Sequence, residues 1–370
     1  MTDTMNIDIA DAGVIIEGLR HRFARSDESK PVLDDINLTL KPGEIVIMTG
    51  PSGSGKTTLL TLIGALRSMQ EGSLRIMGKE LHGLTADDLV SIRRDIGFIF
   101  QAHNLLDALT ARQNVRLALE IAGKDTTDAD KKSEAILTRL GLSERVNYKP
   151  DGLSGGQRQR VAVARALVTQ PRLVLADEPT AALDEESGRI VVELLRERAS
   201  EQNVTVLIVT HDNRILDSAD RIVNMMDGKI HSNIVVQETL EICEFLQKCP
   251  VLEHMTPDEL TEISQKMLKH SIDPDKKVIE IGEEGDKFYV VREGNLDVLV
   301  PENGKMQKVT TLGKGDFFGE AALITGEPRN ATIIARSHTE LYSLDKPSFQ
   351  EALAASATFS EQLRSRFFQR

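Results

Sequence analysis

The first 230 residues alternate short apolar runs with longer stretches of helical character. The runs at residues 44–48, 173–176 and 204–209 are rich in Val, Ile and Leu and have the length of strands. Strands that alternate with helices are typical of a parallel sheet with helices on its faces. The pattern therefore predicts an α/β domain over residues 1–231.

After residue 228 the pattern changes. Thr256 is placed to cap a helix, with Pro257 at the first helical position and Glu259 three residues after the cap. From residue 277 to 344, short alternating runs are broken by Gly and Asn, which is typical of antiparallel strands. Residues 246–370 are therefore predicted to form a second domain, a mainly antiparallel β-roll with flanking helices.

The joint between the two predicted domains, residues 232–245, has no Gly and carries several apolar side chains. This composition favours a packed segment over a flexible tether, and we predict a helical linker there. The chain shows no internal repeat or low-complexity segment, so we expect one copy of each domain.

The composition narrows the class of protein. A chain of 370 residues with 40% hydrophobic and 28% charged residues is typical of a globular protein with two domains. The net charge of −12 argues against nucleic acid as a partner, because binding to phosphates needs an excess of Lys and Arg.

Targeting and redox features favour the cytoplasm. No apolar run approaches the roughly 20 residues that cross a bilayer, and the N-terminus lacks the pattern of a signal peptide. Cys243 and Cys249 have no His or Cys partner at metal-ligand spacing. We interpret both as ordinary thiols in a reducing compartment.

A glycine-rich string, GPSGSGKT, spans residues 50–57 between a predicted strand and a predicted helix. It fits the phosphate-binding loop G-x-x-x-x-G-K-[ST] in the context that this loop requires. Lys56 is expected to reach the β- and γ-phosphates of ATP as part of the catalytic set, and the Thr57 hydroxyl to bind Mg²⁺. The main chain and the following helix start should hold the phosphates. The predicted nucleotide-binding residues here are Gly50, Ser52, Gly53, Ser54, Gly55, Lys56, Thr57 and Thr58.

Two carboxylates follow the apolar run at residues 173–176. Asp177 is placed to hold Mg²⁺ through water, and Glu178 to orient or deprotonate the water that attacks the γ-phosphate. An acidic pair at the end of a strand is a weak signal alone. Beside a phosphate-binding loop it predicts ATP hydrolysis with Glu178 as the base.

The string LSGGQ at residues 153–157, followed by RQRVAVARA, resembles the signature sequence of ABC ATPases. In physical terms it is a helix start preceded by small residues, and so a second anion-binding end. The resemblance implies that this string faces the γ-phosphate bound to a partner subunit; an ordinary Ser-capped helix is the alternative. The residues concerned are Ser154, Gly155, Gly156 and Gln157.

Other motifs of the ABC ATPases follow in the family's order. Gln101 matches the Q-loop, residues 181–184 match the D-loop, and His211 matches the H-switch. The resemblance implies that His211 touches the γ-phosphate and that Gln101 serves both catalysis and Mg²⁺ binding. Phe23 is the expected adenine-stacking aromatic, with core packing as its alternative role and His21 as its rival.

The resemblance covers about residues 13–230, and parts of it are similar to one branch of the family. The strings at residues 44–66, 100–106 and 175–184 resemble the LolD/MacB-type branch, and more narrowly the DevA-type exporter ATPases. The resemblance implies an ATPase homodimer, peripheral on the inner face of the cell membrane, that uses ATP and Mg²⁺. Its expected partners are membrane permease subunits and a membrane-fusion protein, and the permease chooses the substrate.

Two strings in the second domain resemble the phosphate cassette of cyclic-nucleotide-binding domains. They are FFGEAAL at residues 317–323, which includes Gly319, and PRNAT at residues 328–332. Glu320 can accept a hydrogen bond from a ribose hydroxyl, and the guanidinium of Arg329 can fork onto a cyclic phosphate. The main-chain N–H groups of Ala321 and Ala322 can meet the same anion.

Three questions about this domain stay open in the sequence. Asn330 stands where the family often has Ala or Thr, which leaves cAMP and cGMP both possible as the ligand. A scaffold without ligand, in which Glu320 pairs with Arg329, is the alternative. Residues 363, 367 and 368, a Leu and two Phe, are candidates for a lid over the base or for simple docking of the last helix.

Three classes of function follow from these motifs. The first is an exporter ATPase that drives a separate permease and is regulated by cAMP or cGMP. The others are a non-transport ABC ATPase and a signalling protein whose β-roll is a ligand-free assembly module. We favour the first, because non-transport members usually carry two cassettes, a coiled-coil insertion or metal-binding cysteines.

Overall fold

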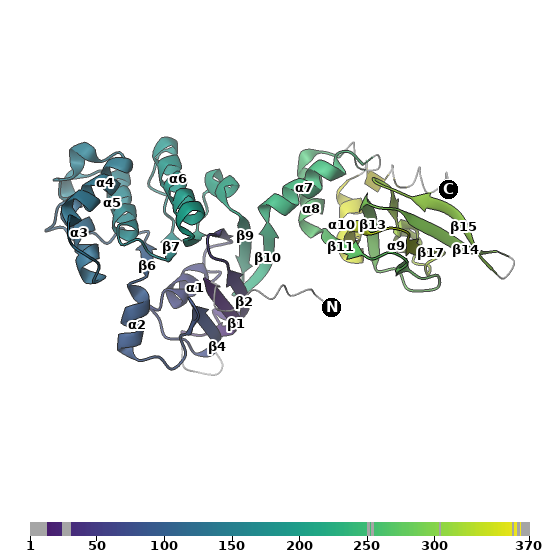
Figure 1. Ribbon diagram of the computed structural model, residues 1–370, viewed down its shortest axis with the longest axis horizontal. Coiled ribbons are helices and arrows are strands. Elements are labelled where there is room, and N and C mark those ends of the chain that lie inside the picture. Colours follow the sequence, from purple (N-terminus) through teal and green to yellow (C-terminus); the bar gives the residue numbers. More distant parts are fainter. Residues whose placement is uncertain are drawn as a thin grey trace. The chain divides into compact units, whose positions relative to one another are not determined.

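The computed structural model describes residues 13–23, 31–249, 252, 255–302, 305–356, 359, 360 and 363. The chain divides into two compact units, Met1–Val236 and Gln237–Arg370, here called the N-terminal and C-terminal units (Figure 1). No helix in the described ranges has the length and apolar character of a membrane span.

The N-terminal unit is built on a six-stranded sheet in the order β10-β9-β3-β8-β7-β6. All neighbours in it run parallel except β9 and β10. A second, antiparallel sheet has the order β2-β1-β4-β5. The strands are β1 (Val14–His21), β2 (Leu33–Leu40), β3 (Ile45–Thr49), β4 (Glu71–Ile76), β5 (Lys79–Glu80), β6 (Ile96–Ile99), β7 (Leu173–Asp177), β8 (Thr205–Val209), β9 (Arg221–Met226) and β10 (Lys229–Val235).

The six-stranded sheet separates two hydrophobic cores, because successive side chains of a strand point to opposite faces. In β3, Ile45 and Ile47 join one core, whereas Val46 and Met48 join the other. Burial on both faces explains why these strands are apolar runs in the sequence and not alternating ones. The predicted α/β fold is confirmed.

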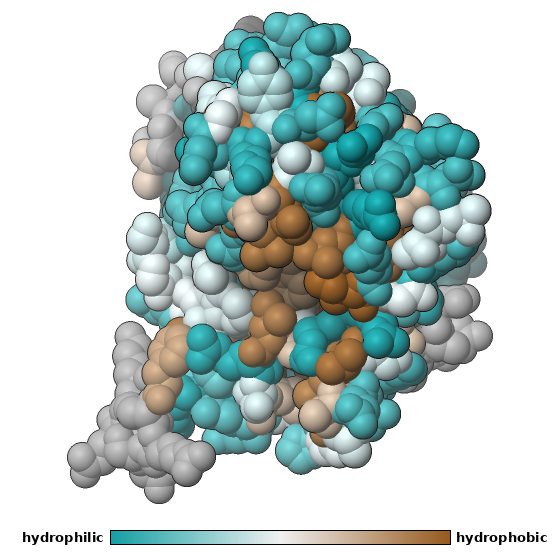
Figure 2. All heavy atoms as spheres, turned by 90° about the vertical axis from the view of Figure 1, so that its left-hand side faces the viewer, coloured by the Kyte–Doolittle hydropathy of each residue, from teal (hydrophilic) through white to brown (hydrophobic). Residues whose placement is uncertain are grey.

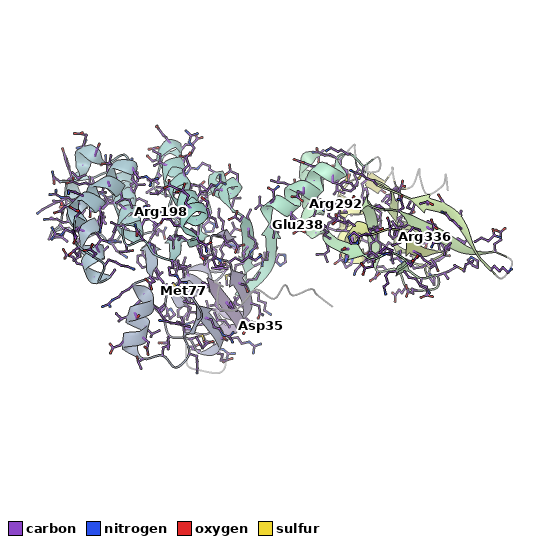
Figure 3. The ribbon with its side chains drawn as sticks, viewed as in Figure 1. Asp35, Met77, Arg198, Glu238, Arg292 and Arg336 are labelled. Atoms are coloured by element: carbon purple, nitrogen blue, oxygen red, sulfur yellow. The ribbon has the colours of Figure 1, made fainter. Side chains whose placement is uncertain are left out.

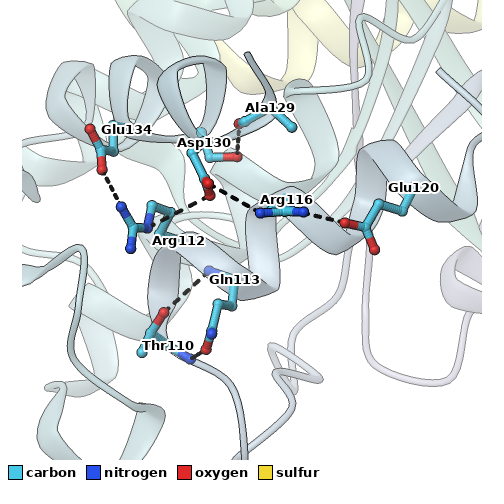
Figure 4. A network of polar contacts seen from close by, with 9 residues as sticks. Thr110, Arg112, Gln113, Arg116, Glu120, Ala129, Asp130 and Glu134 are labelled. Atoms are coloured by element: carbon cyan, nitrogen blue, oxygen red, sulfur yellow. Dashed lines mark hydrogen bonds and ion pairs between the residues drawn. The ribbon is translucent and has the colours of Figure 1, made fainter. Parts of the chain in front are cut away.

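The helices of the N-terminal unit surround this sheet and form a helical subdomain. The helices are α1 (Lys56–Ile63), α2 (Ala86–Arg93), α3 (Ala111–Ile121), α4 (Ala129–Arg139), α5 (Gly155–Leu167) and α6 (Glu185–Gln202). Helices α3, α4 and α5 lie together away from β1 and β2 (Figure 1). Arg112 contacts Glu134 at 2.6 Å, and Arg116 contacts Asp130 at 3.1 Å (Figure 4). Such half-exposed pairs contribute at most about 1 kcal/mol each, so the buried face of α3 carries more of the packing.

The predicted helical linker at residues 232–245 is a strand in its first part and a helix in the rest. The first four of these residues continue β10, which pairs with β9 from Lys229 to Val235. Helix α7 (Val236–Leu246) then follows, and its Ile242 and Leu246 are buried in the core of the C-terminal unit. Exposure alternates along β10, with Ile230, Ser232 and Ile234 half-buried, but the polar Ser232 interrupts the apolar alternation that would indicate a strand in the sequence.

The C-terminal unit contains two four-stranded antiparallel sheets, in the orders β11-β18-β13-β16 and β12-β17-β14-β15. The predicted antiparallel β-roll is therefore confirmed. The strands are β11 (Leu268–Ile272), β12 (Lys277–Ile279), β13 (Lys287–Glu293), β14 (Leu296–Glu302), β15 (Lys305–Leu312), β16 (Phe317–Phe318), β17 (Thr332–Ala335) and β18 (Thr339–Asp345). The helices are α8 (Pro257–Lys266), α9 (Glu320–Thr325) and α10 (Lys346–Ala355).

Helix α8 begins where the sequence predicts it. The Thr256 hydroxyl accepts from the Glu259 N–H, and the Glu259 carboxylate accepts from the Thr256 N–H, which is a capping box. The helices cover one sheet, where Phe288 packs against Phe349 and Phe359. Leu363 is buried in this same core, which fits docking of the chain end and not a lid at that residue. The other two lid candidates lie outside the described residues.

Candidate functional site

A cavity of about 530 Å³ in the N-terminal unit brings together most of the predicted ATP-site residues. It lies at the carboxyl ends of β3, β7 and β8, which are neighbours in the sheet although they are far apart in the sequence. Ligands of parallel α/β sheets bind at this edge. The cavity is lined by Phe23, Val32, Ser52, Gly53, Gly55, Lys56, Thr57, Thr58, Gln101, Asp177, Glu178, Val209 and His211.

The phosphate-binding loop needs its glycines for different reasons. Gly50 has φ +134°, and a Cβ there would lie 1.9 Å from the carbonyl oxygen of Met225. Gly55 has φ +100°, and its Cβ would lie 2.8 Å from the carbonyl oxygen of Val32. Gly53 has φ +81° and nothing within 4 Å, so only its backbone conformation excludes a side chain. The absence of a side chain at Gly50 and Gly55 thus lets the loop pack closely against the main chain of Met225 and Val32, whereas Gly53 faces the cavity.

Lys56, the first residue of α1, lies along this loop and is 6% exposed. Its ammonium donates to the carbonyl oxygens of Gly50 at 2.6 Å and Pro51 at 2.9 Å. Burial lowers the pKa of Lys56, and the charges of Glu178 and Asp177 oppose that shift. The long, flexible stem of Lys lets the same ammonium turn to a phosphate oxygen in the cavity.

Thr57 and Asp177 form the expected magnesium pair. The Thr57 hydroxyl donates to the Asp177 carboxylate at 3.2 Å. Burial raises the pKa of Asp177, while the hydrogen bond from Thr57 and the charge of Lys56 oppose that shift. Mg²⁺ typically takes one or two protein oxygens and completes its shell with water and phosphate, so a hydroxyl and one carboxylate at this distance fit it. The described residues contain no cluster of three or more His, Cys, Asp or Glu side chains placed for a metal.

Glu178 follows β7 in the left-handed conformation, with φ +52°. Its N–H donates to the Val209 carbonyl at 2.8 Å, and its carboxylate accepts from the His211 N–H at 3.1 Å. The imidazole Nε2 of His211 lies 3.9 Å from the same carboxylate. The side chain of Glu178 is 13% exposed and that of His211 is 53% exposed, so both groups can meet a molecule in the cavity.

Phe23 lines the cavity, whereas His21 is buried beside it. The Phe23 side chain is 61% exposed, which excludes core packing as its role. The Arg67 guanidinium lies 4.8 Å from the centre of the Phe23 ring, and the His21 ring meets the edge of the same ring. The arrangement favours Phe23 as the aromatic available to a base.

The signature residues lie outside this cavity. Ser154 caps α5, and Gln157 completes a capping box with it. Gly156 packs against the D-loop, because a Cβ there would lie 3.0 Å from the carbonyl oxygen of Ala182. His103, two residues after Gln101, contacts the Gly155 carbonyl at 3.1 Å and so joins the Q-loop to the start of α5.

Three residues around the ATP cavity were missed in the sequence. Val32 and Val209 line the cavity, and Thr210 holds Glu178 through its hydroxyl at 2.9 Å. Val209 ends β8 and Thr210 follows it, just before His211, so their place beside a motif residue was the available signal. Val32 carried no signal, because its contact depends on the packing of β2 against the phosphate-binding loop. Two predicted residues, Gly50 and Ser54, do not line the cavity. Instead, the Gly50 carbonyl and the Ser54 hydroxyl accept hydrogen bonds from the Lys56 ammonium.

The C-terminal unit contains a cavity of about 590 Å³ with mainly aliphatic walls. All six predicted residues of the phosphate cassette line it: Gly319, Glu320, Ala321, Ala322, Arg329 and Asn330. Strands β14 and β15 supply Val298, Val300 and Val309 to its lining. The lining therefore combines polar and apolar side chains, as a molecule with a phosphate and a base requires.

Arg329 is 6% exposed and joins two segments of the cassette. Its guanidinium donates to the carbonyl oxygens of Gly319 and Lys287, both at 2.7 Å, and lies 3.5 Å from Asp286. Gly319 has φ +88°, and a Cβ there would lie 2.8 Å from Arg329, so the glycine makes room for the guanidinium. Two donors of Arg329 thus brace the main chain, and the side chain still reaches the cavity.

The fold and the first cavity together define a P-loop ATPase of two units. The family model described as ABC transporter matches residues 33–181, and that described as cyclic nucleotide-binding domain matches residues 269–356. An uncharacterized ABC transporter ATP-binding protein of Mycobacterium tuberculosis is 34% identical over 343 residues, which cover 92% of this chain and 94% of that protein. The chain belongs to the family of ABC transporter ATP-binding proteins.

Two further relatives match the N-terminal unit. MacB of Bartonella henselae, a macrolide export ATP-binding/permease protein, is 45% identical over 222 residues, 60% of this chain and 34% of that protein. A solved dimeric ATP-binding cassette in a post-hydrolysis state, bound to ADP and Pi, matches at 38% identity with a TM-score of 0.58. That match covers 60% of this chain and 98% of the other. This protein is accordingly an ATPase with a cyclic-nucleotide-binding domain attached, and relatives of the MacB type confirm the predicted LolD/MacB-type branch.

Proposed function

We propose that this ATPase drives an exporter through a separate permease, and that cAMP or cGMP in the C-terminal cavity modulates its activity. The observation that supports this most is the presence of two cavities, each lined by the phosphate-binding residues of its own family. The export direction is an analogy with the macrolide exporter among the relatives.

In the proposed chemistry, Glu178 takes a proton from the attacking water. The water oxygen then bonds to the γ-phosphorus, and the bond from that phosphorus to the bridging oxygen breaks, so that ADP leaves with the electron pair. Lys56 and His211 stabilise the charge on the γ-phosphate oxygens. Thr57 and Asp177 would hold Mg²⁺, which would supply positive charge to the phosphates.

An apolar groove of about 630 Å³ supports the permease as partner. It lies between α2, α3 and β6 and is bordered by Phe100, Asn104 and Leu106 of the segment around Gln101. Ile121 is 68% exposed on its rim, and Figure 2 shows hydrophobic side chains gathered in a hollow on this face. A permease helix in this groove would act directly on the segment that leads to the ATP cavity.

The groove is tested by Ile121→Asp, with Glu120→Lys as the control on the neighbouring position of α3. Glu120 pairs with Arg116 and does not line the groove. We expect Ile121→Asp to weaken permease binding by about 10-fold or more, because it places a charge in an apolar contact, and to leave permease-free ATPase activity unchanged. Equal permease binding by both variants would contradict the proposal.

Binding of cyclic nucleotide is measured by calorimetry on the full chain with Lys56→Ala, so that the ATP site does not contribute. We expect one site per chain for cAMP or cGMP, and we expect Asn330→Ala, an exposed change, to alter the ratio of the two affinities. No heat with either nucleotide would favour a ligand-free module.

Coupling is tested by ATPase activity of the wild-type chain with its permease, with and without the nucleotide. A ligand shifts an equilibrium only by its differential affinity for two states, typically 5- to 150-fold, so we expect a change of several-fold. Binding without any change in ATPase activity or transport would make the C-terminal unit an assembly or localisation module.

A further inference from the structure

Thr210, the residue between β8 and His211, is fully buried next to the ATP cavity. Its hydroxyl donates to the Oε2 atom of Glu178 at 2.9 Å, while the His211 N–H donates to the Oε1 atom at 3.1 Å. Both carboxylate oxygens of Glu178 are therefore held by the segment that follows β8. Each oxygen keeps a second lone pair for a water molecule.

The Thr210 hydroxyl is itself held in one orientation. It accepts from the Asp212 N–H at 3.0 Å and gives its single proton to Glu178. Asp212 in turn accepts from the Thr180 hydroxyl at 2.9 Å, and Thr180 is also fully buried. The hydrogen bond from Arg214 holds the pKa of Asp212 at about 2, so this carboxylate stays ionised as an acceptor. The turns after β7 and β8 thus hold each other through two buried hydroxyls.

Glu178 needs such support because its own backbone is in a costly conformation. A non-glycine residue in the left-handed region costs about 1–2 kcal/mol, and the long side chain of Glu has several rotamers to lose. A general base must lie within hydrogen-bonding reach of the water, and small displacements reduce the rate steeply. A fixed hydroxyl at 2.9 Å removes most of that freedom.

We propose that Thr210 is a positioning residue for ATP hydrolysis that acts by aiming the Glu178 carboxylate. The inference rests on the proposed role of Glu178 as the base. Thr210 does not line the cavity, so it contributes to the rate and not to the affinity for ATP.

The test compares Thr210→Val, Thr210→Ser and a matched control, Thr205→Val. Thr205 begins β8, the strand that Thr210 follows. It is 1% exposed and donates its hydroxyl to the Lys41 carbonyl, far from Glu178. We expect Thr210→Val to lower kcat by about 10-fold with unchanged KM for MgATP, as the loss of one hydrogen bond to a charged group implies. Thr210→Ser should restore kcat to within about twofold, because it keeps the hydroxyl. Thr205→Val should keep wild-type kcat.

A second arm asks whether Thr210 acts through Glu178. In the Glu178→Gln background, adding Thr210→Val should cause no further loss of single-turnover rate, because there is no longer a base to aim. Independent, multiplicative losses would overturn the proposal. If Thr210→Val does not fold, Thr210→Ala removes the hydroxyl without added bulk and takes its place in both arms.

The outcomes separate the two proposals. Wild-type hydrolysis by Glu178→Gln would end the assignment of the base, and the positioning role with it. Loss of hydrolysis in Glu178→Gln together with wild-type kcat in folded Thr210→Val would leave the base in place and overturn the role of Thr210. A raised KM, or no rescue by Ser, would also overturn it.

Discussion

The two cavities use a basic side chain in different ways. In the N-terminal unit, Lys56 donates to main-chain groups of its own loop, no more than six residues away in the sequence. In the C-terminal unit, Arg329 joins the carbonyl oxygens of Gly319 and Lys287, which belong to separate segments. The lysine is thus a local, movable ligand, whereas the arginine is also part of the scaffold. Loss of Lys56 should affect the binding and hydrolysis of MgATP with little effect on folding, and loss of Arg329 should affect both ligand binding and folding.

The largest effect is expected in the ATP cavity. Glu178→Gln should lower kcat by about 100-fold or more while MgATP still binds, because it removes the base and preserves the shape. Lys56→Ala should lose both ATP hydrolysis and the binding of MgATP. ATPase assays and equilibrium binding of a fluorescent ATP analogue distinguish the two variants. A Glu178→Gln protein as active as the wild type would show that the base is wrong.

A mixing experiment tests whether each ATP site needs two chains. The signature residues lie outside the cavity that holds Lys56, so a complete site should combine Lys56 of one copy with Ser154 of another. Lys56→Ala and Ser154→Arg chains should each be inactive alone. Their equal mixture should recover at most about a quarter of wild-type ATPase activity, because half of the dimers have one intact site. An inactive mixture would contradict a site shared in this way.

The third prediction contrasts the two basic residues directly. Arg329→Ala should abolish binding of the cyclic nucleotide and lower the stability of the C-terminal unit by about 2 kcal/mol or more, because it removes the guanidinium that joins two separate segments. Lys56→Ala should cost the N-terminal unit less than about 1 kcal/mol. Differential scanning calorimetry measures both. Arg329→Lys serves as the charge-preserving control. Equal losses of stability in Arg329→Ala and Lys56→Ala would show that the two basic residues do not differ in their contribution to folding.

The smallest effect concerns a wall of the C-terminal cavity. Asp297, on the face of β14 opposite Val298, accepts from Lys308 at 2.7 Å and from Arg336 at 2.7 Å. Of these residues, Arg336 is labelled in Figure 3. These bonds, that of Lys308 first, hold the pKa of Asp297 at about 2. Because the folded pKa lies below the ordinary value, the stability is present above about pH 4 and is lost as the pH falls toward 2.

Asp297→Asn should remove this contribution at neutral pH, at a cost of about 1 kcal/mol, because both cations are half exposed and screened by water. The free energy of unfolding of the C-terminal unit should also fall less steeply with pH in this variant than in the wild type, as measured by urea unfolding between pH 2 and 6. An unchanged dependence of the free energy of unfolding on pH would show that Asp297 is not the titrating group.

The motifs of the ATP cavity could be predicted because each is a continuous string at the end of a strand. The phosphate-binding loop follows β3, Glu178 follows β7 and His211 follows β8. Parallel strands end at one edge of the sheet, so strings more than 100 residues apart meet there without any knowledge of side-chain contacts.

Groups that act through a third residue could not be predicted in this way. Thr210 is one of many buried hydroxyl residues, and only the register of β7 against β8 brings it to Glu178. Asp297 meets Lys308 and Arg336 from two other segments, and its sequence neighbours give no sign of this. The predicted helical linker was wrong at residues 232–235, which continue β10, because the polar Ser232 interrupts the apolar alternation that would indicate a strand.

The glycines of the phosphate-binding loop carry a consequence for how this protein tolerates mutation. Gly50 is excluded from bearing a side chain by the main chain of β9, and Gly53 by its backbone conformation alone. In a saturation library sorted only for soluble expression, Gly50 variants should vanish as core variants do, while many Gly53 variants survive. A second sort for ATPase activity would then remove the Gly53 variants. Two glycines of one motif would thus be kept by different selective pressures, one for a folded chain and the other for a working motor.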